Sequence, residues 1–179
     1  MKKLTAVFLL SALVFGLCGC SFFSGSPKEP VEFFYPWDDL EAAMKQYPAC
    51  TAIGSEMREA SGHTGELNYL LPLYLRGPLD PELKSPFPAG CQIVGIRWEQ
   101  KTLHITLNGT FAQLDGLDLT TACSCLAKTC FGMTSAYQVC IEANSPDGNS
   151  TVSVVIKADS LLLEDNYEPS ETETVSETK

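Results

Sequence analysis

The sequence is poor in positive charge and in long apolar runs. Lysine and arginine together number 12 in 179 residues, against 22 aspartates and glutamates, and the formal net charge is −10. Because proteins bind phosphate backbones mainly through Lys and Arg, this balance argues against nucleic acid as a partner. The only apolar stretch near membrane-spanning length lies at the N-terminus, which excludes a protein that crosses the membrane several times.

Local signatures of enzymes are also missing. The chain has no His-Glu-x-x-His, no Gly-x-Ser-x-Gly, no phosphate-binding loop and no dinucleotide fingerprint. We therefore predict a non-enzymatic protein with no catalytic residue, no metal site and no cofactor. Numerous carboxylates leave a catalytic acid pair open as an alternative, although each is also explained as helix-end or loop charge. These carboxylates are Asp38, Asp39, Asp80, Glu82, Asp115 and Asp118.

Histidine is scarce, with two residues in the whole chain. His63 lies in a loop ahead of an expected helix. His104 alternates with Leu103 and Ile105, which places it on the sheet face opposite the apolar one. We interpret both histidines as surface residues that bind no ligand.

What the sequence does contain is a clear export signal. Lys2 and Lys3 precede an apolar segment over residues 4–17, which is too short for a comfortable membrane span. The sequence then reads Leu-Cys-Gly-Cys and resembles the bacterial lipobox, which implies cleavage before Cys20 and lipidation of its thiol. Two or three acyl chains would anchor the protein stably on the outer face of the cytoplasmic membrane. An uncleaved signal anchor or an ordinary secretory signal is the alternative.

The remaining chain is expected to form one domain between two extensions. Residues 1–19 are the expected signal peptide, and residues 20–30, with Ser, Gly and Pro, form a tether. Residues 31–163 have the length of a single domain. The acidic segment 164–179 has few apolar side chains to bury, so we expect a solvated, disordered tail.

Hydrophobic periodicity predicts an α/β (α+β) domain in which two main helices pack on a mixed sheet of about five or six strands. The expected strands are 31–35, 51–59, 93–98, 102–107, 137–141 and 152–156, and the expected helices are 40–47, 64–76 and 119–131. Pro72 should kink or split the second of these helices. Gly77 is expected to end it as the C′ residue in the left-handed conformation, and Pro78 forbids its continuation.

An ordered set of landmarks between residues 69 and 143 resembles the GerMN domain of sporulation and spore-germination proteins. The landmarks are a helix running into Gly77-Pro78, a proline-rich segment ending in Pro88-Ala-Gly90, a strand pair, a long helix and a further strand. The resemblance implies a small α/β unit related to the ring-building motifs of secretion machinery, on an exported lipoprotein. It carries over no catalytic residue.

This resemblance implies a function in binding, in sporulation, germination or envelope maintenance, through protein partners or cell-wall glycan such as peptidoglycan. A second possibility is a self-assembling adaptor that associates through exposed sheet edges, and the protein is thus a candidate oligomer. A cell-wall hydrolase or a thiol-redox accessory is a more distant alternative.

The cysteines allow several interpretations. Beyond Cys18 and Cys20 there are six, and an exported domain with six cysteines invites a disulfide framework. Helix geometry forbids a bridge among the three in the last helix, so any bridge from that helix must reach another segment. Free thiols acting as small core residues are the plainer interpretation, and the spacing matches neither a zinc site nor Cys-x-x-Cys. The six are Cys50, Cys91, Cys123, Cys125, Cys130 and Cys140.

Overall fold

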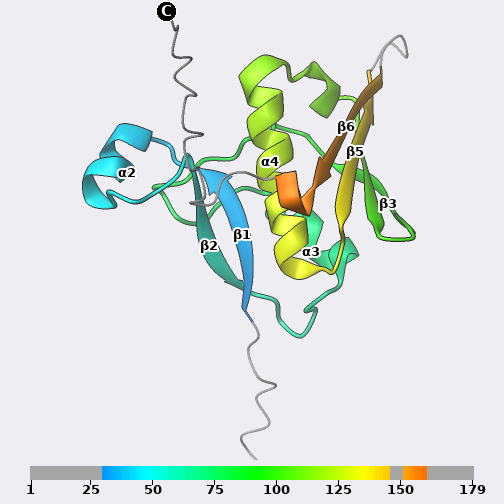
Figure 1. Cartoon of the computed structure of the whole chain (residues 1–179), viewed down its shortest axis with the longest axis horizontal. Helices are drawn as coiled ribbons and strands as arrows, with labels where there is room; N and C mark the ends of the chain where they lie inside the picture. The colour runs from blue at the N-terminus through cyan, green and yellow to red at the C-terminus, as the bar shows by residue number, and fades with distance from the viewer. Residues whose placement is uncertain (1–29, 146–150, 161–179) are drawn as a thin grey trace, which may run out of the picture.

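The computed structural model describes residues 30–145 and 151–160 (Figure 1). The expected signal peptide, Cys20, the tether before Pro30, residues 146–150 and the acidic segment 164–179 lie outside the described residues. The structure therefore bears on the folded domain alone.

The mixed α/β class predicted from the sequence is confirmed, but the single sheet is not. Six strands form two separate sheets, a two-stranded one of β1 and β2 and a four-stranded one in the order β3-β4-β5-β6. The strands are β1 (Pro30–Pro36), β2 (Ile53–Glu59), β3 (Ile93–Glu99), β4 (Thr102–Leu107), β5 (Gln138–Asn144) and β6 (Thr151–Lys157). Each predicted strand is present within a few residues of its expected ends.

The four-stranded sheet is mixed. β4 and β5 run parallel, whereas β3 with β4 and β5 with β6 are antiparallel. Along β4, Leu103, Ile105 and Leu107 are buried and the residues between them are not fully buried. One face of this sheet is therefore the apolar wall of the core, and the other face carries polar side chains.

Helix α4 (Gly116–Met133) separates the two sheets (Figure 1). It contacts β1 on one side and β5 and β6 on another. On the β1 side, the Thr129 hydroxyl oxygen accepts a hydrogen bond from the Phe34 amide at 3.0 Å. Because both sides of the helix are covered, Cys125 and Thr129 are buried as well as the residues of its apolar stripe, which are Ala122, Cys123, Leu126, Ala127 and Cys130.

Helix α3 (Leu67–Tyr74) is shorter than the predicted span of 64–76. It starts late because Gly65, at φ 82, lies in the left-handed region and cannot continue a helix backwards. The predicted splitting at Pro72 is wrong, since α3 continues through it. Pro72 has no backbone N–H, so the helix lacks only the hydrogen bond to the Asn68 carbonyl. Asn68 is exposed, so water can donate to this carbonyl instead.

Helix α2 (Leu40–Gln46) forms at the predicted place and projects at the edge of the molecule (Figure 1). Asp39 caps its N-terminus by accepting a hydrogen bond from the Ala42 amide at 3.0 Å. Ala43 is its buried residue.

The core lies among β1, α3, α4 and the inner face of the four-stranded sheet. Phe33, Tyr35 and Tyr74 pack ring against ring, with centroids 5.3 Å apart for the first and third and 4.8 Å apart for the second and third. All three side chains are fully buried. This aromatic cluster fixes β1 against α3.

Candidate functional site

An open groove of about 530 Å³ lies between three segments that are distant in sequence. We call it the α2 groove. One wall comes from the end of β1 and the start of α2, a second from the proline-rich connector, and a third from the start of α4. Its apolar lining includes Trp37, Leu40, Pro86, Pro88, Leu114 and Leu117.

Large apolar side chains are exposed in and beside this groove. Leu117 is 79% exposed and Leu40 is 38% exposed, and both line the groove. Met44 and Tyr47 continue the exposed stripe along α2. Leu40, Ala43, Met44 and Tyr47 have the spacing of an amphipathic helix, but of these four only Ala43 is buried. The helix is only two turns long and lies past the end of β1, so the core can cover just Ala43.

Trp37 forms the firm side of the groove. Its ring stacks on Tyr47 at a centroid distance of 5.8 Å, and its indole Nε1 donates a hydrogen bond to the Thr51 carbonyl at 2.9 Å. Behind the ring lies Gly54, where a Cβ atom would come within 2.8 Å of both Trp37 and Leu83. Glycine is needed at this position because the indole and a leucine occupy the space of any side chain.

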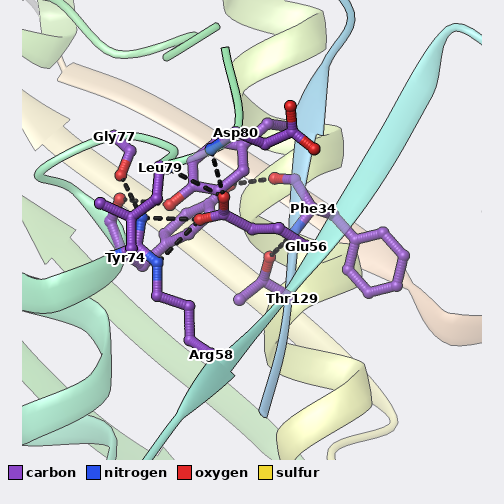
Figure 2. A network of polar contacts seen from close by, with 9 residues as sticks. Phe34, Glu56, Arg58, Tyr74, Gly77, Leu79, Asp80 and Thr129 are labelled. Carbon is purple, nitrogen blue, oxygen red and sulfur yellow. Dashed lines mark hydrogen bonds and ion pairs between the residues drawn. The ribbon is translucent and has the colours of Figure 1, made fainter. Parts of the chain in front are cut away.

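The connector that lines the groove begins at a buried ion pair (Figure 2). Glu56 and Arg58 are two residues apart on β2, so their side chains share one face, and each is 8% exposed. The Arg58 Nη2 lies 2.6 Å from a carboxylate oxygen of Glu56 and donates to the Gly77 carbonyl, also at 2.6 Å. The second Glu56 oxygen accepts hydrogen bonds from the amides of Leu79 and Asp80, both at 2.9 Å.

We call this arrangement the Gly77 corner, defined by Glu56, Arg58 and residues 77–80. The glycine has a φ of 92, which confirms the predicted left-handed conformation. Its position is one residue later than predicted, because α3 ends at Tyr74 with Leu75 as its C-cap. The two charges of the pair are satisfied by each other and by backbone groups, so the corner has a structural function.

The other residues of the predicted Gly-Pro framework also lie on the connector. Gly90 has a φ of 84, and its carbonyl accepts a hydrogen bond from the Asn108 side chain at 2.8 Å. The Pro88 carbonyl accepts the Cys91 amide at 3.1 Å, and Pro88 lines the α2 groove. Pro78 lies within the Gly77 corner, directly after the glycine. The sequence thus located both ends of the connector but missed Glu56 and Arg58, whose alternation on a strand is not distinctive.

The buried tyrosines join the corner to the core. The Tyr35 hydroxyl donates to the Tyr74 carbonyl at 2.8 Å. The Tyr74 hydroxyl donates to the Phe34 carbonyl, also at 2.8 Å (Figure 2). Burial is the main cause that raises the pKa of both phenols above the ordinary value. Both therefore remain neutral hydrogen-bond donors across the physiological range.

Most of the cysteines are buried side chains. None of the six within the described residues is part of a disulfide, and all but the half-buried Cys50 are buried. Burial raises the pKa of Cys91 to about 11 and that of Cys123 and Cys125 to about 12. The thiol of Cys130 shifts in the same direction for the same reason. Protonated, inaccessible thiols are poor nucleophiles.

The carboxylates noted in the sequence as a possible catalytic pair lie at helix ends or in loops. Asp39 caps α2, and Asp80 accepts a hydrogen bond from the Glu82 amide at 2.9 Å. Asp118 lies in the first turn of α4, where the helix dipole favours negative charge. Each of these has the helix-end or loop explanation given above.

The two histidines differ in their surroundings. His63 lies in a loop, stacks on Tyr69 at 4.0 Å and has a 41% exposed side chain, as expected for a surface residue. His104 lies on the predicted polar face, but its side chain is only 12% exposed, so the surface interpretation is wrong for it. It is covered because Cys140 lies directly beside it on β5, and Arg97 lies beside it on β3.

This cross-strand neighbourhood was not visible in the sequence. His104 and Cys140 are 36 positions apart, and they become neighbours only through the parallel register of β4 and β5. Glu142 follows two residues after Cys140 and shares its face. Burial, and then the nearby Glu142 carboxylate, raises the pKa of the Cys140 thiol above its ordinary value.

Comparison with known proteins adds no relative. No family model, curated protein or solved structure matches the chain. Within residues 30–145 and 151–160, no helix combines the length and the hydrophobicity required to span a bilayer.

Proposed function

We propose that the protein is a lipid-anchored, non-enzymatic binding module on the outer face of the cytoplasmic membrane, and that the α2 groove takes an apolar segment of a partner protein. The observation that carries the binding proposal is that Leu40 and Leu117 are exposed and line the same groove, while Met44 and Tyr47 extend the exposed apolar surface along α2. Contiguous exposed apolar surface of this kind marks interaction sites in soluble domains. The anchor rests on Cys20 and the lipobox pattern before it.

The lining favours a protein segment over a glycan. Sugar rings are bound through several hydrogen-bonding side chains in addition to aromatic rings. This groove is lined mostly by apolar side chains, and its polar ones are Lys84, Ser85, Asp118 and Thr121. Its one indole N–H is already donated to the Thr51 carbonyl. A short run of apolar side chains would be complementary to such a surface.

The order of landmarks around Gly77-Pro78 and Pro88-Ala-Gly90 supports a relation to GerMN-domain lipoproteins. We therefore place the proposed partner in sporulation, germination or maintenance of the envelope. The firmly bonded corner at Gly77 fits a binding module, because it fixes one end of the connector whose other end lines the groove.

The binding proposal is tested by site-specific photocrosslinking in the native organism. A crosslinking amino acid is placed at Leu117 or at Leu40 in the groove, and at Val155 as a control that is exposed on β6. We expect the two groove positions to capture one common protein and Val155 not to capture it. Equal capture at Val155, or binding to purified peptidoglycan without protein capture, would contradict the proposal. Capture of a second copy of this chain would favour the adaptor alternative.

The anchor is tested separately. We expect Cys20→Ser to abolish incorporation of a labelled fatty acid, because the thioether requires the thiol, while Cys18→Ser keeps the label. Labelling that survives Cys20→Ser would refute the lipobox interpretation. This result does not depend on the groove, so the two parts of the proposal can fail independently.

A further inference from the structure

Three side chains with metal-binding atoms meet on the polar face of the four-stranded sheet. They are His104 on β4 with Cys140 and Glu142 on β5, and their ligand atoms all lie within 4.8 Å of one another. We call this group the sheet-face triad. The strand register creates it, because His104 pairs with Cys140 and Glu142 is the next residue on the same side of β5.

The imidazole of His104 has one nitrogen without a hydrogen-bond partner. Its Nδ1 is buried and, among the described side chains, lies in no hydrogen bond. It faces the Glu142 carboxylate at 3.9 Å, too far for a hydrogen bond. A buried, unpaired ring nitrogen is costly unless it has a further partner. A bound cation would supply that partner.

The other nitrogen of the ring is suited to orient it. His104 Nε2 lies 3.4 Å from a carboxylate oxygen of Glu99, at the end of the neighbouring strand β3. When this nitrogen carries the proton, the positive end of the N–H faces the carboxylate and the Nδ1 lone pair is directed at the triad. Histidines that bind metals commonly donate their second N–H to a carboxylate in this way.

The distances are close to those of a coordination sphere. Zinc bonds of about 2.0–2.1 Å to nitrogen and about 2.3 Å to sulfur imply donor atoms about 3.3–3.6 Å apart in a tetrahedron. The Cys140 Sγ lies 3.5 Å from the Glu142 carboxylate oxygen, and the His104 Nδ1 lies 3.9 Å from that oxygen. The His104 Nδ1 and the Cys140 Sγ lie within 4.8 Å of each other, so these two side chains must turn toward a common ion to complete the site.

We propose that the sheet-face triad binds one divalent cation of the zinc class through His104 Nδ1, Cys140 Sγ and a carboxylate oxygen of Glu142. A thiolate, an imidazole and a carboxylate together select zinc over magnesium or calcium, which prefer oxygen donors alone. On binding, the cation replaces the proton of the Cys140 thiol, and that proton is released to solvent. Three protein donors leave a fourth position for water.

The charges around the triad are compatible with a cation. Glu99 and Glu142 bring two negative charges, and Arg97 brings one positive charge, with its Nη2 3.8 Å from Glu142. The Arg97 side chain is 55% exposed, so it can turn to solvent when the cation occupies the carboxylate. This proposal is independent of the groove and of its partner.

The test is metal titration of the full-length protein in detergent, with cobalt as a spectroscopic probe and zinc as its competitor. We expect one equivalent of cobalt to give thiolate-to-metal charge-transfer absorption, and zinc to displace it. Zinc should also raise the melting temperature, since a ligand that binds the folded state stabilises it. Absence of both effects would overturn the proposal.

Matched variants assign the ligands. Cys140→Ser should remove the charge-transfer absorption, and Glu142→Gln, on a partly exposed side chain, should weaken zinc binding while the protein stays folded. Glu99→Gln should weaken it by about 10–100-fold, as is usual for a carboxylate that orients a ligand. Cys50→Ser serves as the thiol control and should change nothing. Unaltered binding in Cys140→Ser and Glu142→Gln, or lost binding in Cys50→Ser, would contradict the assignment.

Discussion

The two ends of the connector from Pro78 to Gly90 have opposite surroundings. At its start, a single Glu56 side chain accepts two consecutive backbone amides, and its partner Arg58 is bonded to the Gly77 carbonyl, with both side chains nearly buried. Toward its end, Pro86 and Pro88 line an open groove, across which Leu117 is mostly exposed. The buried end fixes where the connector leaves the core. The exposed end is therefore presented in a defined place, and its apolar surface is available to a partner.

The largest loss of stability should come from breaking the ion pair between Glu56 and Arg58 at the buried end. Arg58→Ala leaves the Glu56 carboxylate buried without its counter-charge, and we expect a loss of about 3–5 kcal/mol in the free energy of unfolding. Urea denaturation measures it. The matched control is Arg97→Ala, whose side chain is 55% exposed beside Glu99, and which should cost less than about 1 kcal/mol. Equal losses for the two variants would show that burial does not distinguish the pairs.

A smaller effect is expected at the glycine of the same corner. Gly77 has a φ of 92, so Gly77→Val should cost about 1–3 kcal/mol through backbone strain. An added Cβ atom would lie 3.5 Å from Ser85, an ordinary contact, so the strain comes mainly from the backbone. If the corner is structural, the urea midpoint and partner binding should fall together.

The control for backbone strain is Gly132→Ala in α4. Its added Cβ would be 3.8 Å from the Phe34 ring, an ordinary contact, and the helical backbone suits alanine. We expect it to stabilise the protein by about 0.5–1 kcal/mol. A Gly77→Val variant as stable as the wild type would refute the strained corner.

Alkaline pH should lower the free energy of unfolding through the thiols buried in the core. Burial raises the pKa of Cys91 to about 11 and the pKa of Cys123 and Cys125 to about 12, whereas the ordinary value for a cysteine is 9.0. Between these values the unfolded chain binds fewer protons than the folded one, so the free energy of unfolding falls as pH rises. The contribution is fully present below pH 9 and is lost progressively toward pH 12.

Urea midpoints under reducing conditions, below pH 9 and at about pH 11, measure this decline. Replacing Cys91 and Cys123 together by alanine should make the decline shallower, because two of the titrating groups are gone. A wild-type midpoint that is constant over this range would contradict the burial of the thiols.

The smallest change in stability belongs to the groove. Leu117 is 79% exposed, so Leu117→Ser should alter the free energy of unfolding by no more than about 0.5 kcal/mol. Partner capture should nevertheless fall strongly, because the variant places a hydroxyl on the apolar wall. A melting temperature lowered by several degrees would show that Leu117 belongs to the core and would weaken the groove as a binding site.

Local patterns were enough to predict most elements. Strict alternation located β4 at residues 102–107, and the glycine-proline pair located the end of α3 to within two residues, with Gly77 in the expected conformation. These features depend on a few neighbouring residues, so periodicity and backbone sterics determine them.

What escaped prediction depends on contacts between distant segments. The alternation of apolar and polar residues is the same whether six strands form one sheet or two. The sequence pattern therefore could not predict that α4 separates two sheets. The stripe of α2 had the period of a buried helix, but its short length and position leave Leu40 and Met44 exposed. The neighbours His104 and Cys140 required the parallel register of two strands, which no local signal specifies.

The position of α4 between the two sheets has a consequence for how the protein unfolds. β1 with β2, β3 with β4, and β5 with β6 each pair antiparallel, but the packing of β1 on the helix joins residues 95 positions apart, as in the bond from the Phe34 amide to Thr129. Both sheets pack on this one helix, so the loss of either sheet exposes buried residues of α4. The two layers should therefore melt in one cooperative transition, with equal calorimetric and van't Hoff enthalpies.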